Sequence, residues 1–168
     1  AVETRVCIAY DSRRMSDVFA RETACVLAAH GIRVLLFATL HSVPQLSFAI
    51  RQYHCAAGVV ITASHNPPKY NGYKVYWSHG GQVAPAEAAA ITEQIRAISG
   101  FKTAYLPFDK ALKQGSITLL GEEADEAYYA ATETLLEYPA LLKEKGGELK
   151  LVYTPLHGTG YVPVTTLL

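Results

Sequence analysis

The sequence has few of the features that mark secreted, membrane or metal-binding proteins. It shows no signal-peptide pattern and no long uninterrupted apolar run. Its cysteines, Cys7, Cys25 and Cys55, are odd in number and have no Cys-x-x-Cys spacing, which favours buried free thiols over disulfides or zinc ligands. Its six histidines form no His-Glu-x-x-His arrangement. These absences favour a cytoplasmic protein with no membrane association.

The charge balance excludes another set of partners. Fifteen basic and fifteen acidic residues cancel, so no net field attracts nucleic acid or an anionic membrane. Hydrophobic residues make up 50% of the chain and charged residues 18%, which excludes a disordered class. A chain of 168 residues can bury one sizeable core and the start of another.

Two enzyme classes lack their sequence signatures. No Gly-x-Gly-x-x-Gly follows the first expected strand, which argues against a Rossmann dehydrogenase. A serine hydrolase would need a Gly-x-Ser-x-Gly elbow and a distant acid–histidine pair, but Ser64 lies in Ala-Ser-His without flanking glycines.

Strand and helix patterns alternate along the chain. We predict strands over residues 5–10, 32–37, 57–62 and 73–77, and helices over 16–30, 45–53, 85–100 and 124–135. Met15, Phe19 and Val26 form the expected apolar stripe of the first helix. A short turn before residue 73 favours an antiparallel fourth strand. The expected fold is α/β: a three-layer α/β/α arrangement with a mixed four-stranded sheet whose fourth strand is antiparallel.

The segment 62–74, Thr-Ala-Ser-His-Asn-Pro-Pro-Lys-Tyr-Asn-Gly-Tyr-Lys, follows a buried-looking strand and places Ser64 at its end. Pro67-Pro68 stiffens the backbone just after this serine. Asn71-Gly72 suits a tight turn with positive φ, which could fold Lys74 back near Ser64. A serine hydroxyl is a weak nucleophile, but a nearby cation would stabilise the product of its reaction if that product is a phosphate ester. A hairpin loop with a capping serine is the alternative.

This segment resembles the active-site serine loop of the α-D-phosphohexomutases, the phosphoglucomutase and phosphomannomutase family. Tyr10-Asp11-Ser12-Arg13 is similar to the arginine-containing turn of the family's first domain, and residues 153–160, Tyr-Thr-Pro-Leu-His-Gly-Thr-Gly, to the opening of its second. The resemblance implies that residues 1–145 are domain I with the catalytic serine loop and that 146–168 are a truncated start of domain II. Because the chain also lacks an initiator methionine, we expect a piece of a longer protein.

The resemblance also implies an enzyme, an intramolecular phosphotransferase. It would move phosphate between the 1- and 6-positions of a hexose, or the 5-position of a pentose, through a phosphoserine and a sugar bisphosphate. Ser64 would be the phosphorylated catalytic residue, and Lys74 would transfer protons. His65 would be a catalytic or electrostatic helper, and Asn66 would support the loop and phosphate. Arg13 would bind phosphate, since arginine suits bidentate contacts; an ion pair at the surface is the alternative.

The implied cofactors are Mg²⁺ and a bisphosphate activator such as glucose 1,6-bisphosphate. Ser64, through its phosphate, is the one metal contact expected here, because no Asp-x-Asp-x-Asp-Arg string occurs in the chain. The Gly-Glu-x-Ser-Gly sugar loop and the Arg-x-Ser-Gly-Thr phosphate segment are also missing. The expected partners are a phosphosugar and the remaining domains of the parent chain, and the isolated piece should be inactive. A phosphate-binding module without chemistry is the alternative.

Overall fold

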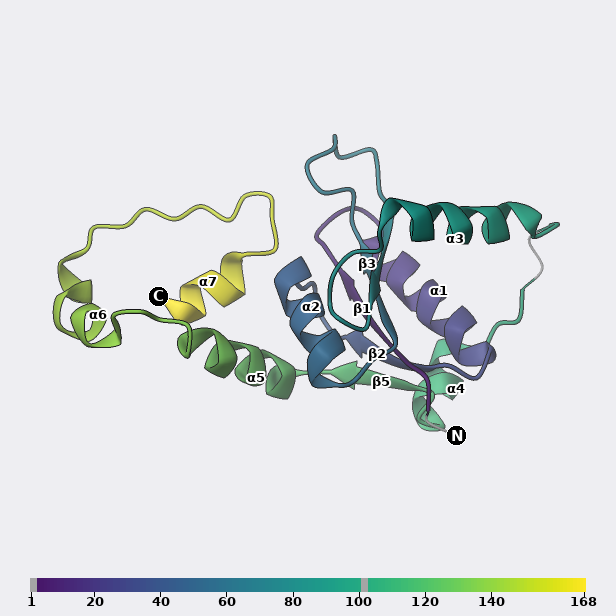
Figure 1. Ribbon diagram of the computed structural model, residues 1–168, viewed down its shortest axis with the longest axis horizontal. Helices are drawn as coiled ribbons and strands as arrows, with labels where there is room; N and C mark the ends of the chain where they lie inside the picture. The colour runs from purple at the N-terminus through teal and green to yellow at the C-terminus, as the bar shows by residue number, and fades with distance from the viewer. Residues whose placement is uncertain (1–2, 101–102) are drawn as a thin grey trace.

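The computed structural model describes residues 3–100 and 103–168. Residues 1, 2, 101 and 102 of the predicted domain I (residues 1–145) lie outside the described residues. A five-stranded mixed sheet forms the centre, in the order β4-β3-β1-β2-β5 (Figure 1). The strands are β1 (Arg5–Tyr10), β2 (Arg33–Phe37), β3 (Ala57–Ile61), β4 (Tyr73–Trp77) and β5 (Ile117–Leu120). All pairs are parallel except β3 with β4, which is antiparallel from Ala57–Trp77 to Ile61–Tyr73. The predicted α/β class and the antiparallel fourth strand are confirmed.

The prediction of four strands was wrong, because β5 adds a fifth at the edge beside β2. This strand is only four residues long, and its two central residues are exposed while Ile117 and Leu120 are buried. Such a pattern has neither the continuous apolar run of a central parallel strand nor a clean alternation. The strand is recognisable only once β2 supplies its partner.

Helices cover both faces of the sheet and complete the three layers (Figure 1). One core joins the sheet to α1 (Ser16–Ala29) and α4 (Phe108–Lys113). The other joins it to α2 (Val43–Gln52) and α5 (Glu122–Glu133). Gly58 lets α2 approach β3, since a Cβ at this position would overlap the side chain of Ile50.

The apolar stripe predicted for α1 was wrong. Met15 and Phe19 are 45% and 44% exposed, whereas the buried residues of the helix are Ser16, Ala20, Ala24, Cys25 and Ala28. These small side chains let the helix axis lie close to the sheet, so the large side chains at its start are left on the outer surface. Hydrophobicity alone therefore assigned the wrong face.

Polar contacts also tie α5 to the rest of the domain. His41 is buried and stacks on Phe37 with ring centroids 4.0 Å apart. Its Nε2 lies 2.9 Å from Oδ1 of Asp125 in α5, and Gln45 Nε2 donates to the same oxygen at 2.8 Å. Its Nδ1 lies 2.8 Å from the Thr39 carbonyl oxygen. Both nitrogens of the ring thus have acceptors, and the network holds the first turn of α5 against α2.

The remaining helices lie outside this core (Figure 1). They are α3 (Pro85–Ala97), α6 (Pro139–Lys145), the 3-10 turn η1 (Gly146–Glu148) and α7 (Tyr161–Leu167). Residue 146, where the second domain was expected to begin, thus lies in a 3-10 turn, and residues 149–160 form an irregular segment that returns to α7 beside α5. Within residues 3–100 and 103–168, no helix is both long and apolar enough to cross a membrane.

Candidate functional site

The serine loop spans residues 62–72 between β3 and β4, at the carboxyl edge of the parallel strands. The turn after β1 lies beside it, and the Asp11 N–H donates to the Ile61 carbonyl oxygen at 3.2 Å. Ligands of open α/β sheets bind at this edge. The fold therefore places the loop where a ligand site is expected.

Gly72 closes the loop, but not through a positive φ as predicted, since its φ does not lie in the left-handed region. The Thr62 N–H donates to the Gly72 carbonyl oxygen at 3.0 Å. A Cβ on Gly72 would lie 2.6 Å from the Thr62 carbonyl oxygen, so a larger residue would push the two ends of the loop apart. Glycine is required here by close approach of the backbone.

Ser64 itself has the left-handed backbone conformation, with a φ of 56°, and it is exposed. This conformation costs a non-glycine residue about 1–2 kcal/mol. Its N–H donates to Thr62 Oγ1 at 2.9 Å, and its carbonyl oxygen accepts from Arg13 Nη2 at 2.8 Å. Contacts on both sides of the residue therefore hold it in an uncommon conformation.

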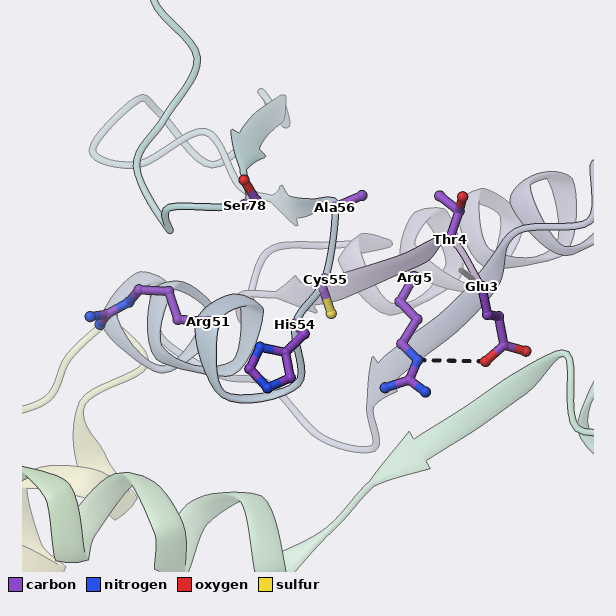
Figure 2. Close-up of a pocket in the computed structure, with 8 residues that line it drawn as sticks. All are labelled: Glu3, Thr4, Arg5, Arg51, His54, Cys55, Ala56 and Ser78. Carbon is purple, nitrogen blue, oxygen red and sulfur yellow. Dashed lines mark ion pairs between the residues drawn. The ribbon is translucent and has the colours of Figure 1, made fainter. Parts of the chain in front are cut away.

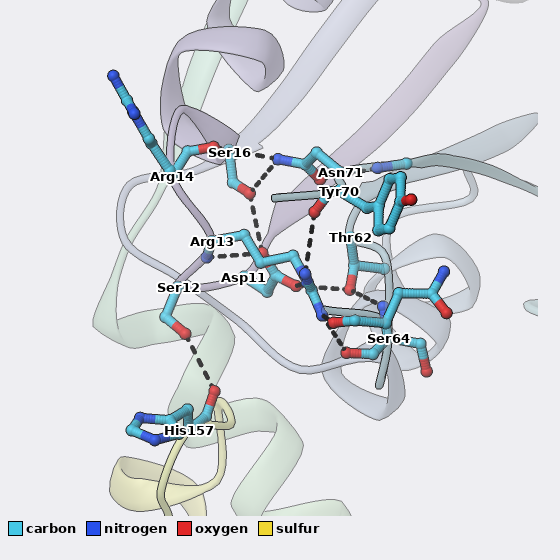
Figure 3. Close-up of polar contacts among 12 residues, drawn as sticks. Asp11, Ser12, Arg13, Arg14, Ser16, Thr62, Ser64, Tyr70, Asn71 and His157 are labelled. Atoms are coloured by element: carbon cyan, nitrogen blue, oxygen red, sulfur yellow. Dashed lines mark hydrogen bonds and ion pairs between the residues drawn. The ribbon is translucent and has the colours of Figure 1, made fainter. Parts of the chain in front are cut away.

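The Arg13 side chain braces the loop, in the sense that it donates hydrogen bonds to four of the loop's carbonyl oxygens (Figure 3). Its Nη1 donates to the carbonyl oxygens of Pro67 and Tyr70, and its Nη2 to those of Ser64 and Asn66. Its Nε lies 3.5 Å from Asp11 Oδ2, and the side chains of this ion pair are only 13% and 15% exposed. A guanidinium has five N–H groups, and all five face these partners.

Asp11 connects the brace to both ends of the loop. Its Oδ1 accepts from the Arg13 N–H at 2.9 Å and from Ser16 Oγ at 2.8 Å, and its Oδ2 accepts from Thr62 Oγ1. Ser16 Oγ in turn accepts from Asn71 Nδ2 at 2.9 Å, at the far end of the loop. The Asp11 carboxylate thus links Thr62, at the start of the loop, with Asn71, near its end, through Ser16.

The other expected site residues are less closely joined. His65 is exposed, and the Asn66 N–H donates to the Ala63 carbonyl oxygen at 3.0 Å. Lys74 lies in β4 opposite Val60, on the face of the sheet that α2 covers. Among the described residues, no hydrogen bond or ion pair joins Lys74 to Ser64. The structure thus brings Ser64, Asn66 and Arg13 together but leaves the proposed role of Lys74 as a prediction.

The sequence analysis placed Asn71 in a turn but did not predict the hydrogen bonds of Asp11, Thr62, Ser16 or Asn71. The signal for Asp11 and Thr62 was their position, since each directly follows a buried strand, β1 or β3. Carboxyl ends of adjacent parallel strands meet at one edge, so polar residues there are expected to lie close together.

Tyr10, the last residue of β1, also contacts the neighbouring loop. Burial raises the pKa of Tyr10, so its hydroxyl stays a neutral donor to the Ala38 carbonyl oxygen at 3.0 Å.

The third motif of the sequence also reaches this edge. Ser12 Oγ donates to the His157 carbonyl oxygen at 3.2 Å, which places the 154–160 segment beside the turn after β1 (Figure 3). All three segments that carried the family resemblance are therefore at one end of the sheet.

Two surface hollows lie at opposite ends of the sheet. One, of about 470 Å³, lies at the opposite edge of the sheet, where Arg5 pairs with Glu3 at 3.5 Å beside His54 and Cys55 (Figure 2). The other, of about 420 Å³, lies next to the serine loop between Phe19 and Tyr73, and Asn71 and Gly72 form part of its wall. Only the second adjoins the candidate site.

The residues present do not by themselves make a magnesium site. In the described part of the chain, no three acidic, histidine or cysteine side chains are grouped as metal ligands. Mg²⁺ favours octahedral oxygen coordination with carboxylates, and the Asp11 carboxylate is already held by four hydrogen-bonding and ionic contacts from Arg13, Ser16 and Thr62. No metal step can therefore be built from this chain alone.

Comparison with known families shows the family of the chain. Residues 1–101 match the family model described as phosphoglucomutase/phosphomannomutase, alpha/beta/alpha domain I. The chain belongs to the phosphoglucomutase/phosphomannomutase family. This match confirms the resemblance of the serine loop.

Named relatives are similar over nearly the whole chain. A probable phosphomannomutase of Haemophilus influenzae is 36% identical over 162 residues, which are 95% of this chain and 31% of that protein. A probable phosphoribomutase of Schizosaccharomyces pombe is 36% identical over 172 residues, covering 100% of this chain and 28% of that protein. The chain thus spans 28% to 31% of the length of these relatives.

Solved structures agree with the fold. A candidate phosphomannomutase from Thermus thermophilus is 33% identical with a TM-score of 0.65, over 83% of this chain and 29% of that one. The open form of Paramecium parafusin, a phosphoglucomutase, has a TM-score of 0.82 at 18% identity, over 98% of this chain and 34% of that one. The second likeness supports the fold alone.

Proposed function

We propose that the full-length protein is a phosphosugar mutase that carries phosphate on Ser64. The observation that carries this proposal is the bracing of a left-handed serine by Arg13 and Thr62 at the carboxyl edge of the sheet. Transfer of a phosphoryl group requires an oxygen held in line with the phosphorus, which is what a fixed loop provides. Membership of the phosphoglucomutase/phosphomannomutase family supports the same reaction.

In the proposed reaction, phosphate moves from Ser64 Oγ to the free hydroxyl of a sugar monophosphate. The P–O bond to the serine breaks as the P–O bond to the sugar forms, and the sugar hydroxyl gives up its proton. Lys74 is the proposed acid and base: it takes the proton of the sugar hydroxyl and gives it to the departing Ser64 Oγ, which becomes a hydroxyl again. The bisphosphate then turns over, and its other phosphate returns to Ser64 Oγ while the serine proton passes through Lys74 to the sugar oxygen that is released. The sugar leaves with phosphate at the other position.

The remaining site residues have supporting roles in this proposal. His65 and Asn66 hold the loop or contribute to its electrostatics, and Arg13 keeps positive charge next to the phosphate site. Since every N–H of Arg13 faces a loop carbonyl or Asp11, its contribution to phosphate binding is through charge and loop shape.

The cofactors and the compartment are also proposals. A sugar bisphosphate such as glucose 1,6-bisphosphate would prime Ser64, and Mg²⁺ would be held by the phosphoserine with ligands from outside this chain. The substrate is a hexose or pentose phosphate, as the names of the phosphomannomutase and phosphoribomutase relatives suggest. Cys7, Cys25 and Cys55 are free and buried, which fits a reducing cytoplasm.

The test is turnover of glucose, mannose and ribose 1-phosphates by the full-length protein, with bisphosphate and Mg²⁺ present. We expect activity on at least one of them and none in Ser64→Ala. The isolated 168-residue chain should not turn over these substrates, because it lacks the other phosphate and sugar contacts. Binding of phosphate by the full-length protein without any turnover would instead favour a non-catalytic module.

A further inference from the structure

A relay of two hydrogen bonds runs from Asp11 to the backbone of Ser64 (Figure 3). The Thr62 hydroxyl donates its one hydrogen to Asp11 Oδ2. The oxygen of that hydroxyl, Thr62 Oγ1, in turn accepts the hydrogen bond of the Ser64 N–H at 2.9 Å. Because a hydroxyl has one hydrogen and two lone pairs, the negative carboxylate fixes which way it points and leaves a lone pair for the serine amide.

The start of this relay is firmly held. Asp11 Oδ1 accepts from the Arg13 N–H at 2.9 Å and from Ser16 Oγ at 2.8 Å, so the carboxylate cannot rotate without losing both bonds. Ser16 is fully buried, and Thr62 is only 7% exposed. Charge-assisted hydrogen bonds in such sheltered surroundings are stronger and polarise one another along a chain. Water has little access to replace them.

The end of the relay is the residue that carries the chemistry. The φ of Ser64, 56°, is the rotation that sets its Cβ relative to its own N–H. An amide pinned by Thr62 therefore fixes the direction of the Cα–Cβ bond, from which the side-chain oxygen extends. Arg13 fixes the carbonyl on the other side of the residue at 2.8 Å, so the two contacts define both peptide planes around Ser64.

From this geometry we propose that Asp11 and Thr62 are positioning residues for phosphoryl transfer: together they aim Ser64 without touching substrate. The inference rests on the proposed function for its kinetic consequence. The relay also occupies the Ser64 N–H, so this amide does not serve the transferred phosphate as a donor. The phosphate must obtain its donors elsewhere.

The matched variants are Thr62→Val, which keeps the shape but loses the hydroxyl, and Thr62→Ser, which keeps the hydroxyl. In the full-length protein, we expect Thr62→Val to lower kcat roughly 10–100-fold, the effect expected of a misplaced reacting group, while KM changes by less than about threefold. Thr62→Ser should recover kcat to within about threefold of the original protein. A role in folding alone would lower thermal stability without this split between kcat and KM.

Asp11→Asn gives a second, independent test of the relay, because an amide offers one acceptor oxygen where the carboxylate uses two. This variant should show the same loss of kcat as Thr62→Val. Hydrogen–deuterium exchange of the peptide that contains Ser64 should be faster in Thr62→Val and Asp11→Asn than in Thr62→Ser. This readout does not depend on mutase activity, so it separates a failed relay from a failed function.

The outcomes are distinct. Unchanged kcat in Thr62→Val, or a Thr62→Ser variant as slow as Thr62→Val, would overturn the relay. If Thr62→Val does not fold, the comparison of Thr62→Ser with Asp11→Asn decides, and equal kcat and equal exchange in these two would overturn it. Faster exchange in the variants of a protein whose Ser64 never carries phosphate would support the relay and reject the proposed function.

Discussion

Arg13 Nη2 donates a hydrogen bond of 2.8 Å to the carbonyl oxygen of Ser64, although the two residues are 51 positions apart. The contact joins the turn after β1 to the loop after β3. Since β1 and β3 are adjacent parallel strands, both segments leave the sheet at the same edge. The architecture of the sheet thus creates the site by bringing a cation to a serine loop.

The first prediction concerns this cation. Arg13→Lys replaces five donors in a planar fork with three on a flexible stem, which cannot reach four carbonyl oxygens together. We expect a loss of about 2–4 kcal/mol in the free energy of unfolding and roughly 10²-fold lower kcat in the full-length protein. Urea denaturation and steady-state kinetics measure the two effects.

Arg14→Lys is the matched control, because the Arg14 side chain points away from the loop (Figure 3). It should leave both quantities within experimental error. If Arg13→Lys behaved like Arg14→Lys, the brace would not be needed to hold Ser64.

The second prediction concerns Lys74. If it transfers the proton of the sugar hydroxyl, Lys74→Met should lower kcat roughly 10²–10⁴-fold, the usual contribution of general acid–base catalysis. Lys69→Met is the control, since Lys69 is an exposed lysine of the serine loop whose Nζ lies 5.1 Å from the centre of the Tyr70 ring. Similar turnover in both variants would remove Lys74 from the mechanism.

The sequence predicted most of the central fold. The limits of β4, 73–77, were predicted as observed, because a loop with two prolines and Asn-Gly separates it clearly from β3. The edge strand β5 was missed because its partner, β2, lies some 80 residues earlier, and the Val34–Ile117 pairing is invisible to local patterns. The buried face of α1 was missed because small side chains, not the largest ones, form it.

The site was predictable in its position but not in its connections. A serine at the end of a buried strand, followed by two prolines, indicated the loop and its residue Ser64. Nothing local indicated that Arg13 would face four carbonyl oxygens, or that Thr62 would lie between Asp11 and the Ser64 amide. The contacts of Arg13 with Ser64 and of Asp11 with Thr62 each join residues 51 positions apart, so they depend on which strands become neighbours.

The third prediction concerns the thiols. Burial raises the pKa of Cys55 from its ordinary value of 9.0 to about 11, and it raises that of Cys7 well above the same value. Because the thiolate is the reactive form, the native protein should not react with Ellman's reagent at pH 8, whereas the unfolded protein should expose all three cysteines of this segment.

The same shift makes stability depend on pH. The folded state keeps the Cys55 proton that the unfolded state loses above pH 9, so this stabilisation is present below pH 9 and is lost as the pH rises toward about 11. Urea denaturation between pH 8 and 11 should show a smaller decline in Cys55→Ala than in the original protein. An identical decline in both would contradict the assignment to Cys55.

The fourth prediction concerns His41. His41→Ala leaves the Asp125 carboxylate with one of its two partners and removes the ring stacked on Phe37. We expect the free energy of unfolding to fall by about 1–3 kcal/mol, because the variant loses a hydrogen bond to a charged group and the packing of a buried ring. His30→Ala, at an exposed position after α1, is the control and should change it by less than about 0.5 kcal/mol.

The phosphorylation state of Ser64 tests the central claim most directly. The full-length protein should be incubated with glucose 1,6-bisphosphate and Mg²⁺, digested, and analysed by mass spectrometry. We expect the peptide that contains residues 62–74 to carry one phosphate at Ser64, and we expect this phosphate to disappear when excess sugar monophosphate is added. A catalytically active protein with no phosphate at Ser64, or full activity in Ser64→Ala, would contradict the account.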